Sequence, residues 1–178
     1  MPTKKVSLAF VITLAIAAAV VGAAVRYLQD TRANAAPQSR PEFSLPDLQN
    51  KQHSIAEWDG KLVLINFWAS WCPPCIKEMP ALDRIRLEYQ NQNFEIIGIT
   101  AEPAKDANLY LANNPVSYPI LNGESSASAL GQQYGNTIGS IPFSVLIDRH
   151  GLIQRRYHGE VDLADLKNDI STFSELIN

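Results

Sequence analysis

The sequence predicts an α/β protein in which a central mixed sheet carries helices on both faces. Apolar runs rich in β-branched residues alternate with segments of helical spacing between residues 61 and 134. Two further apolar runs, 143–147 and 152–157, flank a turn that ends in His150-Gly151 and so predict a hairpin. An amphipathic segment follows at 163–177. Strand–helix alternation that ends in a hairpin and a helix is typical of a mixed sheet covered on both sides.

The elements between residues 61 and 134 follow from the spacing of apolar residues. Continuous apolar runs predict strands buried on both faces, and apolar residues three or four positions apart predict helices. In chain order, we expect a strand at 61–67, a helix at 74–90, a strand at 94–100, a helix at 104–113, a short strand at 118–121 and a helix at 126–134. Asn114-Pro115 closes one of these helices, and Asp162 is a plausible N-cap of the last helix of the chain.

Length, charge and cysteine count narrow the class of protein. The 178 residues suit one domain with a short appendage. A net charge of -3 offers no basic face to nucleic acid, so we expect no nucleic-acid partner. The two cysteines, Cys72 and Cys75, close too short a loop to add much as a structural staple. Such a pair is better suited to redox chemistry or to half of a metal site.

The N-terminal segment predicts a membrane anchor. Residues 6–25 carry no charge, and a helix of that length spans roughly 30 Å, the hydrocarbon thickness of a bilayer. The alternative is a cleaved signal peptide, but the small-residue site at 33–35 lies well past the apolar run. We therefore expect a signal anchor at 1–25, a flexible linker at 26–41 and a folded domain at 42–178.

Lys4 and Lys5 argue for a cytoplasmic N-terminus. Arg26, Arg32 and Arg40 lie on the other flank, so the positive-inside count does not decide the orientation. The short N-terminal tail resembles a secretory n-region, and we therefore expect export of the domain to the periplasm or cell exterior.

The residues that carry chemistry lie where the first buried strand passes into a helix. The segment 67–75 reads FWASWCPPC. At a helix start the unpaired N–H groups and the dipole favour a thiolate, so Cys72 is expected near the N-cap as the more exposed, attacking sulfur. Cys75 would lie one turn further in, ready to resolve a mixed disulfide. Zinc binding and an inert bridge are the alternatives, but the only other soft ligands, His53, His150 and His158, are not spaced as a partner pair.

Three motifs give the chain a family resemblance. The stretch 60–75, GKLVLINFWASWCPPC, resembles the TlpA/ResA-type thioredoxin-like proteins of the redoxin superfamily. So do Glu78-Met79-Pro80 and Ile141-Pro142 followed by SVLID at 144–148. The resemblance covers 42–178 and implies a thioredoxin-like fold with a strand–helix insertion at 102–134. It also implies a membrane-anchored thiol–disulfide oxidoreductase outside the cytoplasm, often a reductant, with cytochrome c maturation as one setting.

The resemblance assigns roles to individual residues. It makes Cys72 the attacking thiol and Cys75 the resolving thiol. It makes Pro142 a cis-proline facing the dithiol, so that the backbone of Ile141 can pair with an extended substrate segment. Pro80 matches the place where the active-site helix bends, which is a structural role.

Glu78 is the third candidate catalytic residue. It lies three residues after Cys75 and so on the same helical face. In ResA-like members a glutamate here borders the site and affects thiol ionisation, and a carboxylate can also relay protons. Ordinary thioredoxins have a buried aspartate in the preceding strand, where this chain has Asn66. Because asparagine cannot usefully accept a proton, Glu78 is the better candidate base.

Two tryptophans, Trp68 and Trp71, lie beside the CxxC motif. Trp68 is expected to pack around the site. Trp71 is expected mainly to pack as well, although its position next to Cys72 would let it contact a substrate protein. The expected partners are proteins with disulfides or thiols and a separate, membrane-embedded or other thiol donor that reduces the Cys72-Cys75 bond. No cofactor is expected beyond that redox-active disulfide.

Two other functions on the same fold remain as alternatives. A thiol peroxidase-like enzyme would use Cys72 to attack peroxide, but such enzymes usually place a Thr and an Arg at the peroxide pocket, and residues 69–71 lack that pattern. A copper- or metal-delivery protein would bind through Cys72, Cys75 and a distant histidine. Copper chaperones on this fold tend to have three residues between the cysteines, whereas this chain has two.

Overall fold

The computed structural model describes residues 18, 21–23 and 38–175. The chain divides into two units, Met1–Pro37 and Gln38–Asn178. In the first unit, Ala18 and residues 21–23 are helical. Within the described residues, no helix has the length and hydropathy that a membrane span requires. The predicted anchor at 1–25 lies almost entirely outside the described residues and stays a prediction.

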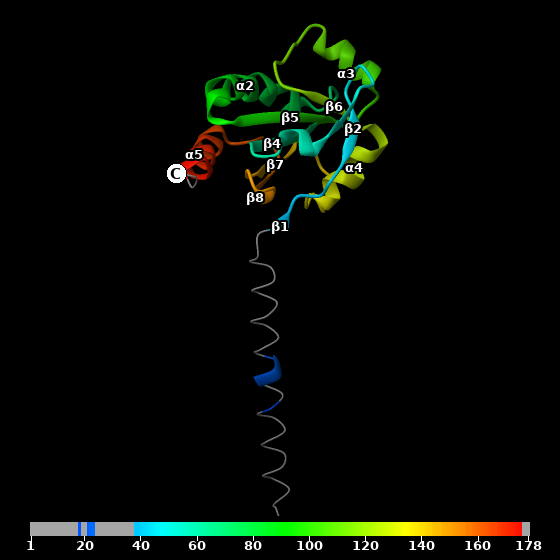
Figure 1. Ribbon diagram of the computed structural model, residues 1–178. Helices are drawn as coiled ribbons and strands as arrows, with labels where there is room; N and C mark the ends of the chain where they lie inside the picture. Colours follow the sequence, from blue (N-terminus) through cyan, green and yellow to red (C-terminus); the bar gives the residue numbers. More distant parts are fainter. Residues whose placement is uncertain (1–17, 19–20, 24–37, 176–178) are drawn as a thin grey trace, which may run out of the picture. The chain divides into compact units, whose positions relative to one another are not determined.

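The second unit is built on a six-stranded mixed sheet (Figure 1). In spatial order, its strands are β1 (Gln38–Ser39), β8 (Leu152–His158), β7 (Phe143–Ile147), β4 (Leu62–Trp68), β5 (Phe94–Thr100) and β6 (Ile120–Asn122). β4 pairs in parallel with β5, and β5 in parallel with β6. The pairs β4–β7, β7–β8 and β1–β8 are antiparallel. The predicted mixed sheet is therefore confirmed, with β4 paired along both edges.

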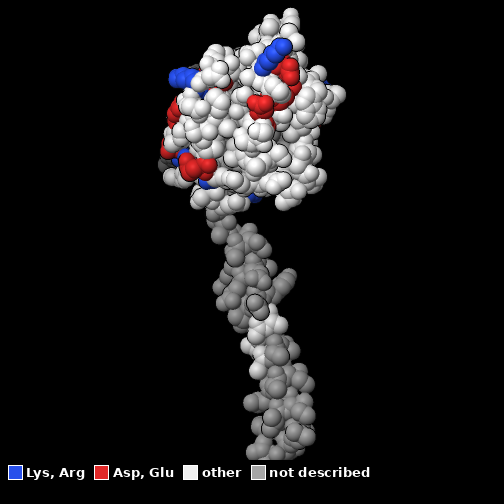
Figure 2. Space-filling model, turned by 90° about the vertical axis from the view of Figure 1, so that its right-hand side faces the viewer, with Lys and Arg blue, Asp and Glu red and all other residues white. Residues whose placement is uncertain are grey.

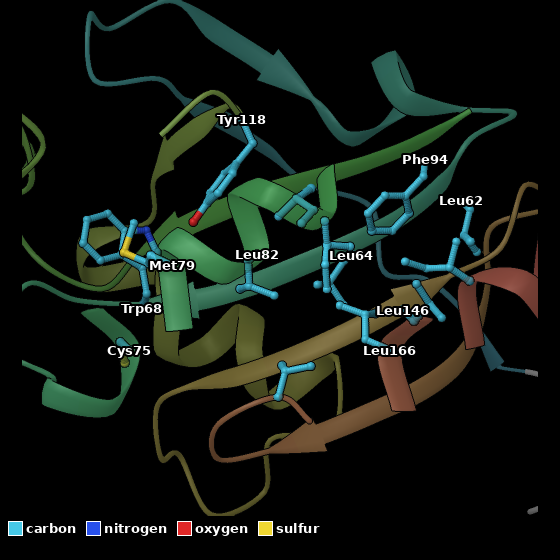
Figure 3. Packing of buried hydrophobic residues seen from close by; sticks show 14 of the residues in the cluster. Leu62, Leu64, Trp68, Cys75, Met79, Leu82, Phe94, Tyr118, Leu146 and Leu166 are labelled. Atoms are coloured by element: carbon cyan, nitrogen blue, oxygen red, sulfur yellow. The ribbon is translucent and has the colours of Figure 1, made fainter. Parts of the chain in front are cut away.

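Four α-helices cover the two faces of the sheet. They are α2 (Pro73–Tyr89), α3 (Ala104–Leu111), α4 (Glu124–Gln133) and α5 (Leu163–Glu175). The buried side chains form two clusters, one on each face. α2, α3 and α5 contribute to one cluster, and α4 contributes to the other. Figure 3 shows part of the first cluster, in which Cys75 lies toward the same end as Trp68.

Strand β4 shows how the sequence assigns side chains to the two faces. All seven of its residues are buried. Because side chains alternate along a strand, Leu62, Leu64 and Trp68 reach the α2 face, while Val63, Ile65 and Phe67 reach the α4 face. The same alternation turns Asn66 toward α2. A polar side chain is thereby placed inside an apolar layer, directly beneath the active-site helix.

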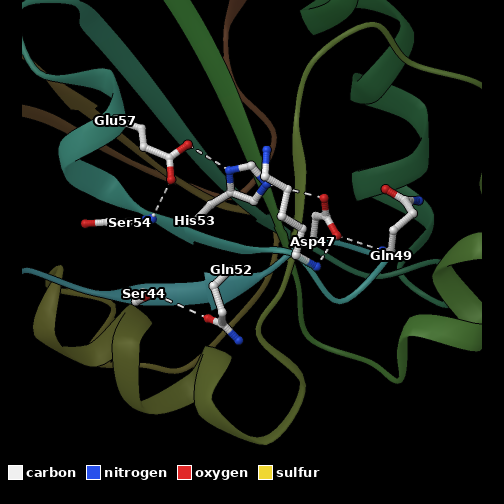
Figure 4. Close-up of polar contacts among 8 residues, drawn as sticks. Ser44, Asp47, Gln49, Gln52, His53, Ser54 and Glu57 are labelled. Atoms are coloured by element: carbon white, nitrogen blue, oxygen red, sulfur yellow. Dashed lines mark hydrogen bonds and ion pairs between the residues drawn. The ribbon is translucent and has the colours of Figure 1, made fainter.

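A small hairpin that apolar periodicity did not predict precedes β4. Strands β2 (Ser44–Pro46) and β3 (Gln52–Ser54) pair antiparallel and lead into a short 3-10 helix, η1 (Ile55–Trp58). Polar contacts stabilise this region (Figure 4). His53 contacts Glu57 Oε2 through Nδ1 at 2.8 Å and Asp47 Oδ2 through Nε2 at 3.3 Å. Few apolar residues alternate here, which is why periodicity did not reveal the strands.

The folded domain begins earlier than we expected. β1 pairs with β8, and the Arg40 N–H donates to the carbonyl of Gly151 at 2.7 Å. Residues 38–41, assigned above to the flexible linker, therefore belong to the sheet and its edge. The remaining linker residues lie outside the described part of the chain. The linker prediction failed here because a two-residue edge strand made of Gln and Ser has no apolar signal.

Candidate active site

The two cysteines lie at the N-terminus of α2, as the spacing predicts. Cys72 is the N-cap residue in extended conformation, and Pro73 and Pro74 occupy the first turn. The carbonyl of Cys72 accepts the first helical hydrogen bond, from the Ile76 N–H at 3.1 Å. Cys72 and Cys75 are joined in a disulfide. The structure therefore represents the oxidised form of the pair, and the helix dipole favours a thiolate at Cys72 once the bond is reduced.

Access to the two sulfurs differs in the predicted direction but only slightly. Cys72 is 4% exposed and Cys75 is completely buried. The neighbours of Cys72, namely Trp71, Pro73 and Pro74, are exposed. Cys72 therefore lies just beneath the surface, and an attacking thiol has to reach it between these side chains. Cys75 is buried and joined to Cys72, which is the arrangement that a resolving cysteine needs.

Glu78 is buried in a polar network one turn beyond Cys75. Its side chain is only 2% exposed. The Asn66 Nδ2 donates to Glu78 Oε1 at 2.8 Å, and the Val161 N–H donates to Glu78 Oε2 at 2.8 Å. The second hydrogen of Asn66 Nδ2 goes to Ser144 Oγ at 2.9 Å. Since Asn66 and Ser144 are direct partners across β4 and β7, the sheet register itself aligns this chain of contacts.

Burial dominates the electrostatics of this carboxyl. Desolvation raises the pKa of Glu78 above its ordinary value of 4.5, and the hydrogen bonds from Val161 and Asn66 oppose this by stabilising the charged form. The negative charge of Glu160 adds a small further rise in the pKa. The result is a carboxyl that takes up a proton more readily than a surface glutamate. That property suits a group that has to accept a proton from a neighbouring thiol.

A second buried carboxylate shapes the loop that leads to Cys72. Glu102 is 4% exposed. Its Oε1 accepts the Ser70 N–H at 2.7 Å, and its Oε2 accepts the Ser70 hydroxyl at 2.7 Å. Two charge-assisted bonds to one residue fix the backbone between β4 and α2. The position of Trp71 and Cys72, which follow Ser70 directly, therefore depends on Glu102.

The other predicted site residues have distinct surroundings. Trp68 is fully buried and lies 5.9 Å from Tyr110 between ring centroids, so its packing role is confirmed. Trp71 is 65% exposed, and the expectation that it mainly packs is wrong, because the loop turns its ring outward. The Ile141-Pro142 bond is cis, as the resemblance implied. Ile141 packs against the buried cluster that contains both cysteines.

Sequence reasoning did not find Ser144 and Glu102 as site residues. A signal for Glu102 existed, because carboxyl ends of adjacent parallel strands meet at one edge of a sheet. β4 ends just before the CxxC loop and β5 ends at Thr100, two residues before Glu102. Ser144 offered no comparable signal, since its importance depends on the register between β4 and β7. Among residues 18, 21–23 and 38–175, no three His, Cys, Asp or Glu side chains are grouped to hold a metal ion.

The sequence of this chain is similar to known thiol–disulfide oxidoreductases. The family model described as Redoxin matches residues 35–170, which is most of the chain. The chain belongs to the redoxin family. Several relatives, among them the following two, carry the name thiol-disulfide oxidoreductase ResA. The protein from Halalkalibacterium halodurans is 33% identical over 138 residues, covering 76% of this chain and 73% of the relative. The protein from Geobacillus thermodenitrificans is 28% identical over 147 residues, covering 82% of each chain.

Solved structures show the same fold. A thiol:disulfide interchange protein of the thioredoxin family from Chlorobium tepidum superposes with a TM-score of 0.69 at 26% identity, covering 78% of this chain and 97% of that one. This redoxin therefore has the predicted thioredoxin-like fold. With its Cys72–Cys75 disulfide, it is a member of the thiol–disulfide oxidoreductases.

The raised pKa of Glu78 predicts how stability depends on pH. The native state keeps the Glu78 proton to higher pH than the unfolded chain does. This contribution to the free energy of unfolding is complete below about pH 4.5, the ordinary glutamate pKa, and is lost as pH rises through the raised pKa of Glu78. We expect Glu78→Gln, which cannot ionise, to flatten that decline in urea unfolding of the oxidised protein at a series of pH values.

A matched control for this measurement lies on the same helix. Glu88 is half-exposed and pairs with Lys167 at 2.7 Å. Glu88→Gln removes a carboxylate of the same kind from α2 without touching the buried network, and we expect the wild-type slope to persist. If Glu78→Gln also retained the wild-type slope above pH 4.5, Glu78 would not titrate between the native and unfolded states in the way the structure indicates.

Proposed function

We propose that this redoxin reduces disulfide bonds of other proteins outside the cytoplasm, with the Cys72–Cys75 dithiol as the only electron carrier. The observation that carries the proposal is the placement of the pair: Cys72 lies just beneath the surface at a helix N-terminus, and Cys75 is buried one turn from Glu78, a carboxyl whose pKa is raised by burial. The apolar N-terminal run at 6–25 supports an anchor that holds the domain at the outer side of the cytoplasmic membrane. The ResA-type resemblance supports a role in cytochrome c maturation.

The reaction begins with the reduced protein. The Cys72 thiolate attacks one sulfur of a substrate disulfide, so that a mixed disulfide forms and one substrate sulfur leaves as a thiolate. The Cys75 thiol then loses its proton to Glu78, and the resulting thiolate attacks the Cys72 sulfur. The second substrate sulfur leaves, and both substrate thiolates take up protons. Two electrons have passed from the protein dithiol to the substrate, and the Cys72–Cys75 disulfide seen in the structure remains.

The donor that restores the dithiol has to reach the same sulfur. In the oxidised form Cys75 is fully buried, whereas Cys72 keeps a small opening to the surface. A donor thiolate would therefore attack Cys72 and release Cys75 as the leaving thiolate. We propose a membrane-embedded or other thiol protein as this donor. Substrate and donor would then use the same opening at different times, which the cycle of oxidation and reduction requires.

Trapping tests the roles of the two cysteines. We expect Cys75→Ala, once reduced, to accumulate covalent complexes with a disulfide-bonded protein such as insulin, because no thiol remains to resolve the bond at Cys72. Cys72→Ala should accumulate none, since Cys75 is buried. Non-reducing electrophoresis and mass spectrometry of the linked peptides give the answer. If both variants still catalysed turnover, the assignment would be wrong.

The role of Glu78 can be separated from that of Cys72. Glu78→Gln should leave the first step, formation of the mixed disulfide, close to wild type and slow its resolution by about 10²-fold or more, the usual contribution of a positioned base. Single-turnover measurements with quenched samples resolve the two steps. Glu88→Gln on the same helix serves as the control. Equal slowing of both steps would instead point to a change in the position of the helix.

The direction of electron flow is tested by the reduction potential. A reductant should have a potential nearer to that of thioredoxin, about −270 mV, than to that of the oxidant DsbA, about −120 mV. Equilibration of the protein with glutathione redox buffers, read by mass after alkylation, measures this value. A potential near the oxidising end would favour disulfide formation as the activity and would contradict the proposed direction.

A further inference from the structure

A surface hollow opens directly beside the active-site loop. It is a shallow, open depression with a volume of about 460 Å³. It is bordered by the loop before α2 on one side and by α3 on the other. The lining residues are Ser70, Trp71, Glu102, Asp106, Leu109 and Tyr110. Trp71 directly precedes Cys72 in the chain, so a side chain bound in the hollow contacts the loop that carries the attacking cysteine.

The walls of the hollow are apolar and unusually exposed. Trp71 is 65% exposed and Leu109 is 70% exposed. They are two of the five large hydrophobic side chains that are exposed among the described residues. Tyr110 is half-buried, and its ring lies 5.9 Å from that of the buried Trp68, which holds this wall in place. Two large apolar side chains from separate elements thus face solvent across one depression. Burying such apolar surface against a partner protein lowers the free energy of the complex.

The polar groups of the hollow are acidic. Glu102 is nearly buried, and the two bonds from Ser70 hold its carboxylate in position. Asp106 is exposed in the first turn of α3. Within the described ranges neither carboxylate forms an ion pair. Lys105 neighbours Asp106 in the sequence, but no Lys, Arg or His lines the hollow.

We propose that this hollow binds a lysine or arginine side chain of the partner protein, carried on the segment that contains the reacting cysteine. Such a side chain combines an apolar stem with a cationic head, and both halves find a counterpart here. The stem would lie against Leu109 and the ring of Trp71, where an aromatic face also attracts a cation. The head would pair with Asp106 above the carboxylate of Glu102. The proposal rests on the proposed function, because it gives that site a preference among substrates.

The face drawn in Figure 2 carries acidic and basic side chains in small mixed groups among uncharged ones. A face of that kind does not attract a basic partner as a whole. The preference should therefore depend on the position of the cationic residue relative to the cysteine. Because Asp106 is exposed, the preference should also weaken at high salt.

Peptides test the subsite with the reduced full chain. Each peptide carries one cysteine in a disulfide with 2-mercaptoethanol, and one neighbouring position within three residues of it is either Arg or Gln. Stopped-flow kinetics give the rate constant for attack by Cys72 on each. At low salt, we expect at least one position at which the Arg peptide reacts about 2- to 5-fold faster than its Gln counterpart, the size expected of an exposed ion pair.

Variants locate the origin of that ratio. Asp106→Asn and Leu109→Ala should each bring the Arg-to-Gln ratio toward one, the first by removing the charge and the second by removing the apolar wall. Asp165→Asn is the matched control, because Asp165 is an exposed aspartate in the first turn of α5 and lines a different hollow. The ratio should survive this substitution. A ratio, rather than a rate, cancels any general loss of activity in a variant.

The outcomes separate the two proposals. If Arg and Gln peptides react equally at every position while the wild-type protein still reduces hydroxyethyl disulfide, the subsite does not exist but the reductase activity stands. If a preference for Arg exists but Asp165→Asn removes it as fully as Asp106→Asn does, the hollow is not its source. If the reduced protein transfers electrons to no disulfide, the proposed function and the subsite fail together.

Discussion

The site depends on β4 being locked into the centre of the sheet. The strand is buried on both faces and bonded to β5 and β7 along its two edges, so its C-terminal end cannot shift relative to its neighbours. The chain leaves this end, passes through Ser70 and enters α2 at Cys72. Because the parallel strand β5 ends alongside, Glu102 arrives at the same edge and bonds to Ser70. A rigid strand end thus becomes a rigid position for the reactive sulfur.

Opposing physical effects set the pKa of Glu78. Burial alone would make the carboxylate very costly, by several kcal/mol. Hydrogen bonds to a charged group contribute about 1.5–3 kcal/mol each, so the bonds from Asn66 and Val161 offset part of that cost. The balance leaves a pKa above the usual value without removing the ability to ionise. A fully exposed glutamate would lack the raised pKa. A buried glutamate without hydrogen-bond donors would lack the ability to ionise.

Two polar networks lie on either side of the dithiol in the sequence, one around Glu102 and one around Glu78. Glu102 acts on the backbone before Cys72, while Glu78 lies beyond Cys75 on the other side of the disulfide in sequence. One carboxylate therefore fixes the loop that presents the attacking sulfur, and in the proposed reaction the other accepts the proton of the resolving sulfur. The hollow lined by Glu102 and Trp71 borders the loop that Glu102 holds, and it is here that we propose a cationic side chain of the substrate binds.

The local sequence was sufficient to predict the helices and strands that have a strong apolar periodicity. The apolar runs at 94–100 and 143–147 match β5 and β7, and the CxxC spacing with its two prolines predicted Cys72 at the start of α2. Only tertiary structure could decide which polar residues meet. Ser144 and Asn66 are 78 positions apart and touch because of strand register, and Trp71 is exposed because the loop at Ser70 is bonded to Glu102. Periodicity reports which face of an element is apolar, whereas such contacts depend on how elements pair across long stretches of chain.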